Sequence, residues 1–346
     1  MGSRTLDSES DEASEVLART RRMVDPVLRT AVYSLPDAMR RIAAYHFGWA
    51  EADGTPAHGD AGKAIRPALV LAAAQALGGP AEEAVHAAAA VELVHNFTLL
   101  HDDVIDGDPT RRHRPTTWSV FGSANAILAG DALHALALRI LAGDRHPAAA
   151  AAVRRLAGCV VELCEGQYAD CAFEKRSDVT LDECLAMAEA KTGALLGCAC
   201  ALGALYAGAD PDTADALDAF GRRTGLAFQL IDDLMGIWGD PEATGKPIGS
   251  DLAARKKSLP VVSALRSGTP AAADLAALYG TGRPLDEAEL RRAADAVDRA
   301  GGRDWARTQA CDRMSAAMDH LYRAVPNPVA AGDLLTLAEL VTRRNH

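Results

Sequence analysis

The chain is a succession of helical stretches separated by turn residues, and this pattern limits its fold more than any other feature. Alanine dominates and aromatic residues are few, which favours helix over strand. There is no alternating strand pattern of useful length, no GxGxxG, no P-loop and no fixed-period repeat. Residues 81–105 and 214–237 are long and apolar over most of their surface, as in central helices of a bundle. We therefore expect an all-α fold.

Composition limits the domain organisation and the partners. The 346 residues, 49% of them hydrophobic, can bury a sizeable core. We expect a disordered acidic leader over residues 1–15 and one all-helical domain over 16–346. The net charge of -11 opposes non-specific binding to nucleic acid or to an anionic membrane.

The cysteines and the length of the apolar runs indicate the cellular location of the protein. The seven cysteines form no CxxC pair, as in a cytoplasmic protein with reduced thiols. No apolar run approaches the roughly 20 residues of a membrane span. The polar, acidic N-terminus also differs from a signal peptide. We therefore expect a cytoplasmic protein without a membrane span.

The sharpest local signal is the segment 101–106, HDDVID, at the end of an apolar stretch. Asp102 and Asp106 are four residues apart, so they share one face of a helix. Carboxylates at a buried helix end repel one another unless a cation neutralises them, and oxygen-only ligands select a hard ion such as Mg²⁺. The next segment adds cations that suit diphosphate oxygens: Arg111, Arg112 and Arg114. A solvated helix end explains the acids alone, but acids followed by arginines predict a site for a metal-bound diphosphate.

A second acidic pair, Asp232-Asp233, ends another apolar stretch and raises the same question. Downstream of it stand Lys246, Asp251 and Lys256, so cations follow this pair as they follow the first. A third cationic segment, 62–67, opens a helical stretch, where backbone N–H groups also favour anions. In isolation that segment is equally well an ordinary basic helix start.

In order and spacing, these motifs resemble those of the trans-type isoprenyl diphosphate synthases, the polyprenyl synthetase family. The resemblance runs from about Lys63 to Pro260. Its motifs are Gly62-Lys63-x-x-Arg66-Pro67, His95, Asp102-Asp103-x-x-Asp106, Arg111-Arg112, Gly166-Gln167, Lys191-Thr192-Gly193, Phe228-Gln229-x-x-Asp232-Asp233, and Gly245-Lys246 through Lys256. The resemblance implies an isoprenoid-synthase helical bundle around a central active-site cavity, magnesium-dependent prenyl transfer and a homodimer.

The resemblance also implies roles for individual residues. Asp102 and Asp106 would bind magnesium that bridges the allylic diphosphate, and Asp232 a further ion, three ions in all; Asp103 and Asp233 belong to the same catalytic motifs. The residues implied to grip the allylic diphosphate are Arg111, Lys191, Lys246 and Lys256. Those implied to form a metal-free isopentenyl diphosphate pocket are Lys63, Arg66, His95 and Arg112. Thr192 and Gln229 resemble positions that stabilise the carbocation, although Thr192 is nearly as well explained as a buried polar residue satisfied by its neighbours.

Two positions depart from the family pattern. The second motif normally ends in a third aspartate, and here that place is Gly236. Asp240 lies two turns beyond Asp232 and is a poor substitute. We therefore expect retained activity with weaker magnesium affinity, tested by the magnesium requirement of Gly236→Asp. His113 stands where the family commonly has glycine.

Product length in this family depends on side chains just before the first motif. Phe97 and Thr98 lie five and four residues before Asp102. A single aromatic there resembles synthases that make geranylgeranyl diphosphate (C20), although Phe97 is also explained as a core residue. Three alternatives stay open: a farnesyl diphosphate (C15) synthase, a terpene cyclase of the same fold and a catalytically silent regulatory subunit. A cyclase would not need the isopentenyl diphosphate pocket.

Overall fold

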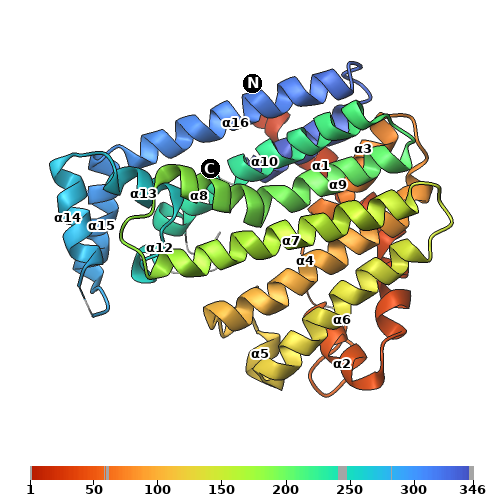
Figure 1. Cartoon of the computed structure of the whole chain (residues 1–346), viewed down its shortest axis with the longest axis horizontal. Coiled ribbons are helices and arrows are strands. Elements are labelled where there is room, and N and C mark those ends of the chain that lie inside the picture. The colour runs from red at the N-terminus through yellow and green to blue at the C-terminus, as the bar shows by residue number, and fades with distance from the viewer. Residues whose placement is uncertain (1, 58, 60–61, 241–247, 282, 343–346) are drawn as a thin grey trace. The chain divides into compact units, whose positions relative to one another are not determined.

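Helices form most of the protein in a computed structural model that describes residues 2–57, 59, 62–240, 248–281 and 283–342 (Figure 1). The α-helices are α1 (Gly2–Tyr33), α2 (Asp37–His46), α3 (Ile65–Ala76), α4 (Val85–Asp106), α5 (Thr117–Phe121), α6 (Ser123–Ala142), α7 (Ala149–Glu174), α8 (Leu181–Ala188), α9 (Ala194–Tyr206), α10 (Pro211–Trp238), α12 (Ser250–Ala253), α13 (Leu259–Leu265), α14 (Pro270–Tyr279), α15 (Glu287–Arg299), α16 (Gly302–Ala324) and α17 (Gly332–Thr342). A 3-10 helix, η1 (Ala81–Ala84), and a π-helix, η2 (Glu189–Gly193), complete them. The predicted all-α class is confirmed.

The N-terminal segment differs from its sequence-based description. Helix α1 begins at Gly2, so the structure has helix where the composition predicts a disordered leader over residues 1–15. The helix continues as an amphipathic segment whose apolar residues, such as Val24 and Leu28, are buried. The disordered leader expected over residues 1–15 stays a prediction.

Two helices correct the expectation about apolar length. Ser123–Ala142 and the continuous helical stretch Leu181–Tyr206 are long and apolar enough to cross a membrane by length and composition. The core helices of soluble proteins can be equally long and apolar. In Leu181–Tyr206, 67% of the most apolar 18-residue stretch is buried within the structure. The statement that no apolar run approaches 20 residues is therefore wrong, while the support for a membrane span is weak.

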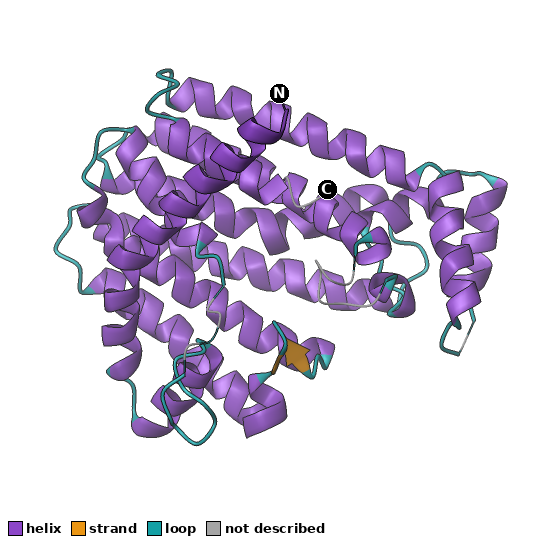
Figure 2. Ribbon diagram, turned by 180° about the vertical axis from the view of Figure 1, so that it is seen from behind, coloured by secondary structure: helices purple, strands orange, loops and turns teal. Residues whose placement is uncertain are grey.

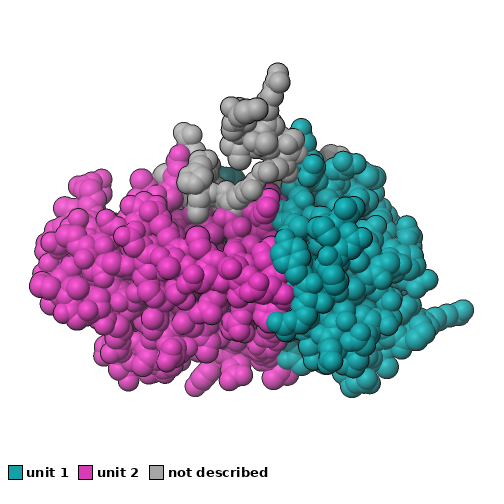
Figure 3. All heavy atoms as spheres, turned by 90° about the horizontal axis from the view of Figure 1, so that it is seen from above, with its two compact units in different colours: residues 1–160, 198–218, 321–337 teal, residues 161–197, 219–320, 338–346 magenta. Residues whose placement is uncertain are grey.

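The chain divides into two compact units, coloured separately in Figure 3. Unit 1 comprises residues 1–160, 198–218 and 321–337, and unit 2 comprises residues 161–197, 219–320 and 338–346. Helices α7, α9, α10, α16 and α17 contribute residues to both units. The single domain expected over residues 16–346 stays a prediction.

Unit 1 is built around α4, which packs along α6 (Figure 1) and also contacts α1 and α3. Residues 87–91 of α4 are completely buried, and four of the five are alanines, so neighbouring helices approach closely. Gly203 of α9 shows the same principle, because a Cβ there would lie 2.7 Å from the Cβ of Ala73 on α3. Small residues thus hold the helix that ends in the first aspartate motif.

A two-residue hairpin follows α4, and its strands are drawn in orange in Figure 2. Strands β1 (Thr110–Arg111) and β2 (Arg114–Pro115) pair antiparallel, with Arg111 opposite Arg114. The turn residues Arg112 and His113 have φ values of 50° and 62°. Positive φ at both central residues is typical of a type I′ hairpin turn, where glycine is favoured. This conformation explains why a glycine suits the place of His113.

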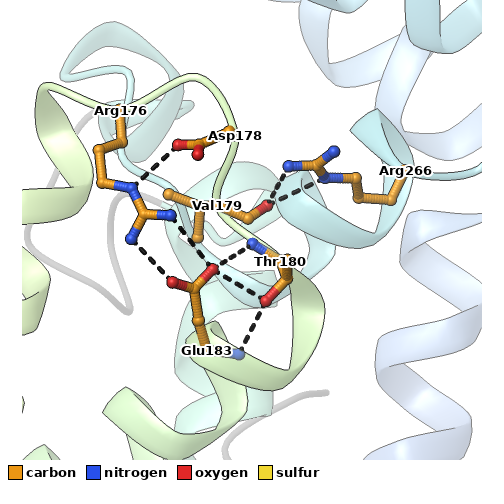
Figure 4. Close-up of polar contacts among 6 residues, drawn as sticks. All are labelled: Arg176, Asp178, Val179, Thr180, Glu183 and Arg266. Carbon is orange, nitrogen blue, oxygen red and sulfur yellow. Dashed lines mark hydrogen bonds and ion pairs between the residues drawn. The ribbon is translucent and has the colours of Figure 1, made fainter.

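Unit 2 contains α8, whose start is fixed by a polar network (Figure 4). The Thr180 hydroxyl accepts a hydrogen bond from the Glu183 N–H, and the Glu183 carboxylate accepts one from the Thr180 N–H, forming a capping box. The Arg176 guanidinium donates to Glu183 at 2.8 Å and to Asp178 at 2.9 Å, while Arg266 donates to the Val179 carbonyl. This network orients the helix that leads into η2.

Candidate functional site

The first aspartate motif ends α4, where Gly107 adopts a left-handed φ of 68° and stops the helix. Asp102 is half-buried and Asp106 is exposed, whereas Asp103 is 2% exposed. The Arg111 Nε donates to Asp103 Oδ1 at 2.7 Å. Burial raises the pKa of Asp103, and the Arg111 charge opposes that rise. Asp103 therefore anchors Arg111, and the two remaining carboxylates share the accessible face.

The hairpin directs its consecutive arginines to different places. Arg111, in β1, reaches back to the aspartate motif. Arg112, in the turn, lies against Gly62, because a Cβ on Gly62 would be 2.5 Å and 2.7 Å from the terminal nitrogens of Arg112. The turn thus divides two neighbouring cations between two groups of residues assigned to different substrates.

Three of the four residues predicted for the isopentenyl diphosphate pocket, Arg66, His95 and Arg112, lie close together in unit 1, and Lys63 is next to Gly62 in the chain. Lys63 and Arg66 flank the start of α3, and Gly62 beside them touches Arg112. Arg66 Nη1 lies 3.1 Å from His95 Nε2. Burial lowers the pKa of His95 well below its ordinary value, and the charges of Arg66, Arg112 and Arg111 lower it further. His95 is therefore neutral and its Nε2 accepts the hydrogen bond from Arg66.

A buried polar network that the sequence did not predict lies next to this pocket. Asn96 Nδ2 donates to the Glu92 carbonyl at 2.8 Å and to Glu92 Oε1 at 3.2 Å, and Asn96 Oδ1 lies 3.1 Å from His46 Nε2. Burial raises the pKa of Glu92 to about 7, against the opposing charge of Arg66. Burial lowers the pKa of His46 to about 3, helped by the charge of Arg111. His46 is consequently neutral and donates from Nε2 to Asn96.

A cavity of about 200 Å³ lies beside the segment that carries Lys63. Its lining includes Gly62 and Ala64, which flank Lys63 in the chain, and the buried acid Glu92. Helix α1 contributes Arg21, whose guanidinium donates to the Gly62 carbonyl. Helix α1 therefore supports the loop that holds the predicted isopentenyl diphosphate residues.

In unit 2, the predicted Lys191 and Thr192 lie in the π-helical turn η2. Short π-helical turns within α-helices occur frequently at functional sites. Lys191 Nζ pairs with Asp170 Oδ2 at 2.6 Å. Gly166, one turn before Asp170 on α7, allows this approach, since a Cβ there would lie 2.5 Å from the Lys191 backbone nitrogen. Gly166 of this motif thus lets the turn that carries Lys191 pack closely against α7.

A hydrogen-bonded chain connects η2 with the second aspartate motif in α10. The Thr192 hydroxyl donates to Gln229 Oε1 at 2.7 Å, and Gln229 Nε2 donates to Asp233 Oδ1 at 2.8 Å. The N–H of Leu259 donates to Asp233 Oδ2 at 2.8 Å. Thr192 is thus satisfied by a neighbour, as the alternative interpretation predicts, and its hydroxyl orients Gln229. Both carboxylate oxygens of Asp233 are therefore used in hydrogen bonds to protein groups.

The acids of the second motif differ in exposure and protonation. Asp232 is exposed, whereas Asp233 is 3% exposed. Burial raises the pKa of Asp233 to about 6, while Lys256 opposes the rise. For Lys256 the acids Asp233 and Asp251 outweigh burial, so its pKa is raised and it stays charged. Lys246 lies outside the described residues.

In each unit, the accessible carboxylates fit a magnesium ion that shares its ligands with a diphosphate. In the described parts of the chain, no three acidic, histidine or cysteine side chains gather closely enough to hold a metal by themselves. The accessible carboxylates are Asp102 and Asp106 in unit 1 and Asp232 in unit 2. Magnesium usually takes one or two carboxylates and completes its shell with phosphate oxygens and water, so this chemistry suits it.

The two residues predicted to set product length lie on α4. Phe97 is 8% exposed and packs against His134 of α6, with ring centroids 5.3 Å apart, and against His101 at 4.8 Å. The Thr98 hydroxyl donates to the His95 carbonyl at 2.8 Å, a local bond within the helix. Phe97 thus lies between two helices just before the aspartate motif.

Sequence reasoning overlooked several residues that the structure brings to these sites. Helical spacing could have found some: Glu92 and Asn96 flank His95 on α4, and Asp170 follows Gln167 by three residues. His46 had no such signal, because its partner lies on another element. Asp251 was noted in the sequence, but no role was assigned to it. The overlooked residues are His46, Glu92, Asn96 and Asp170.

Comparison with known proteins gives a consistent result. Residues 56–321 match the sequence model of the family described as polyprenyl synthetase. A geranylgeranyl diphosphate synthase of Mycobacterium tuberculosis is 51% identical over 336 residues, covering 97% of this chain and 95% of the relative. A (2E,6E)-farnesyl diphosphate synthase of Mycobacterium bovis is 46% identical over 333 residues, covering 95% and 92%.

Solved structures show the same likeness. A polyprenyl synthetase from Streptomyces coelicolor A3(2) superposes with a TM-score of 0.91 at 46% identity, covering 95% of this chain and 99% of that chain. A geranylgeranyl pyrophosphate synthetase from Pyrococcus horikoshii superposes with a TM-score of 0.84 at 32% identity, covering 96% and 99%. The likeness in fold therefore extends over nearly the whole length of each protein.

Proposed function

Because the chain belongs to the polyprenyl synthetase family, a family of prenyltransferase enzymes, we propose that it elongates allylic diphosphates with isopentenyl diphosphate to give geranylgeranyl diphosphate. The reaction is the head-to-tail 1'-4 condensation, repeated until the chain reaches C20. The relative named as a geranylgeranyl synthase is 51% identical, against 46% for the farnesyl synthases. This difference favours C20 over the alternative C15 product.

The observation that carries the proposal is the cationic pocket of unit 1. Arg66, the neutral His95 and Arg112 lie around the Gly62-Lys63 segment, in an arrangement of cations that requires no metal. A diphosphate held there would be a second substrate, distinct from the one at an aspartate motif. A terpene cyclase, which uses a single diphosphate substrate, would have no use for this pocket.

The chain's own residues would act at three points of the reaction. Arg111, Lys191 and Lys256 would hold the allylic diphosphate, so that it departs with the electron pair of the C–O bond. Thr192 orients Gln229, whose amide oxygen would stabilise the resulting carbocation. The double bond of isopentenyl diphosphate then forms the new C–C bond, and a proton passes to the released diphosphate.

Magnesium belongs to the proposal through Asp102, Asp106 and Asp232, with up to three ions. When bound, it would supply positive charge that stabilises the departing diphosphate. Asp103 and Asp233 would act as positioning residues, since each is buried and used in hydrogen bonds. Lys246 is assigned to the allylic diphosphate by the family resemblance alone.

The proposal also includes a homodimer in the cytoplasm. Helix α6 supports the dimer, because its apolar side chains Ile127 and Leu128 are 40% and 54% exposed. Exposed apolar side chains that lie together are typical of an interface. The proposed cytoplasmic location rests on the seven cysteines, all of which are free.

The test is incubation of the purified protein with isopentenyl diphosphate, magnesium and, in turn, the C5, C10 and C15 allylic diphosphates, followed by product identification by mass after dephosphorylation. A product series ending at C20 is expected. A series ending at C15 would leave the synthase proposal in place and replace the product. Formation of a hydrocarbon or alcohol without consumption of isopentenyl diphosphate would favour the cyclase. Absence of any turnover would favour the silent subunit.

A further inference from the structure

The second aspartate motif has Gly236 where a third acid is expected, and the structure shows what fills that place. Gly236 follows Asp232 by one helical turn of α10, so a side chain at 236 would extend on the same face. An ideal Cβ on Gly236 would lie 2.5 Å from Cγ and 2.8 Å from Oδ1 of Asp251, with Oδ2 closer still. The carboxylate of Asp251 therefore occupies the space of the missing side chain.

The backbone around Asp251 fixes that carboxylate. Asp251 lies in the first turn of α12, which begins after Gly249 in a left-handed conformation with φ of 73°. At the other end of the turn, the Lys256 N–H donates to the Asp251 carbonyl at 2.8 Å. Asp251 is thus held by local structure on both sides.

The segment that carries Asp251 also contacts the second motif at another point. The N–H of Leu259, eight residues after Asp251, donates to Asp233 Oδ2 at 2.8 Å. Asp251 therefore lies in a segment that packs against the second motif.

From this geometry we propose that Asp251 supplies, from α12, the metal-binding acid that the second motif lacks at position 236, and that it acts together with Asp232 when a diphosphate is bound. The inference rests on the proposed prenyltransferase function and assigns Asp251 a role in it. Glycine at 236 leaves room for the Asp251 carboxylate, because a side chain there would overlap that carboxylate in its present position.

This inference reverses an expectation drawn from the sequence. The missing acid at 236 suggested weaker magnesium affinity, with Gly236→Asp as the substitution that would improve it. In the structure, an aspartate at 236 would collide with Asp251 and place two carboxylates in contact, which repel each other. Gly236→Asp alone is therefore expected to weaken metal binding.

The experiment measures metal affinity directly, without turnover. Mn²⁺ binding to the full-length protein is followed by electron paramagnetic resonance in the presence of inorganic diphosphate. Asp251→Asn, which keeps the shape of the side chain and removes its charge, is expected to weaken Mn²⁺ binding about 10- to 100-fold. Asp240→Asn, an exposed acid on the same segment, is the matched control and should bind as the wild type does.

The exchange variant Gly236→Asp/Asp251→Gly separates a metal-binding role from a structural one. It returns one carboxylate to the same space from the opposite side and should regain most of the affinity that Asp251→Asn loses. Wild-type affinity in Asp251→Asn, with or without a lower unfolding temperature, would overturn the inference. The same preparations are assayed for consumption of isopentenyl diphosphate. An inactive wild type would contradict the proposed function, whereas an active wild type with unchanged Mn²⁺ binding in Asp251→Asn would contradict this inference alone.

Discussion

Single residues decide how closely the helices of each site approach, and Gly166 and Gly158 illustrate the difference. Both lie inside α7, where glycine lowers helix stability relative to alanine. A Cβ on Gly166 would lie 2.5 Å from the Lys191 backbone nitrogen, whereas one on Gly158 would meet nothing within 4 Å. The same residue type therefore has a packing role at one position and none at the other.

Gly166→Ala is expected to lower the free energy of unfolding by roughly 1–3 kcal/mol, because overpacking forces a backbone shift at η2. Gly158→Ala is the matched control and should raise it by about 0.5–1 kcal/mol. Urea denaturation of both variants checks the pair. Equal effects of the two substitutions would show that η2 yields to the added methyl group.

Phe97 belongs to the residue scale as well. We expect Phe97→Ala to shift the product distribution toward longer prenyl diphosphates, because removing the ring opens the space beside His134 and His101. Chromatography of dephosphorylated products, with the unfolding temperature measured alongside, checks the change. A normal product distribution from a folded variant would assign Phe97 to packing alone.

At the scale of elements, α4 carries both the aspartate motif and a buried polar network. The helix and the aspartate motif at its end were predictable, because apolar runs and regularly spaced acids are visible in one sequence. The network was predictable only in part. Glu92 and Asn96 share a helix with His95, but their partner His46 lies on α2, and sequence spacing does not reveal contacts between elements. The Asp251–Gly236 contact was hidden for the same reason.

The pKa of Glu92 gives this network a pH dependence. The folded protein holds a proton up to about pH 7, whereas an unfolded chain releases it near the ordinary value of 4.5. Stability from this group is therefore lost as pH rises from 4.5 to 7, by at most ~3 kcal/mol. Glu92→Gln stays neutral and should not show this loss.

Urea unfolding at pH 5 and pH 8 measures the difference between wild type and Glu92→Gln. Between pH 5 and pH 8, the free energy of unfolding of the wild type is expected to fall relative to that of Glu92→Gln. Glu165→Gln, an exposed glutamate on α7, serves as control and should follow the wild type. A gap that stays constant between the two pH values would contradict the raised pKa.

At the scale of the whole molecule, the likeness to known synthases covers nearly the entire chain, yet α6 leaves apolar side chains exposed. Only 39% of the most apolar 18-residue stretch of α6 is buried within this chain. Helical character and apolar composition were predictable here, but exposure was not, because it depends on which neighbours a helix has. Such a surface is typical of an interface.

Leu128→Asp is expected to shift the proposed homodimer toward monomer, since it places a charge on the exposed face of α6. Sedimentation velocity at several protein concentrations checks the shift. Glu165→Gln, an exposed glutamate on α7, is the control and should leave the association unchanged. Identical sedimentation of wild type and Leu128→Asp would place any dimer interface elsewhere.

The hairpin turn at Arg112 and His113 has a further consequence. Arg111 contacts the first aspartate motif and Arg112 lies against the Gly62 loop, so a single peptide bond joins residues assigned to the two substrates. A substitution that changes the turn would therefore disturb the contacts of both arginines, and with them the groups assigned to both diphosphates.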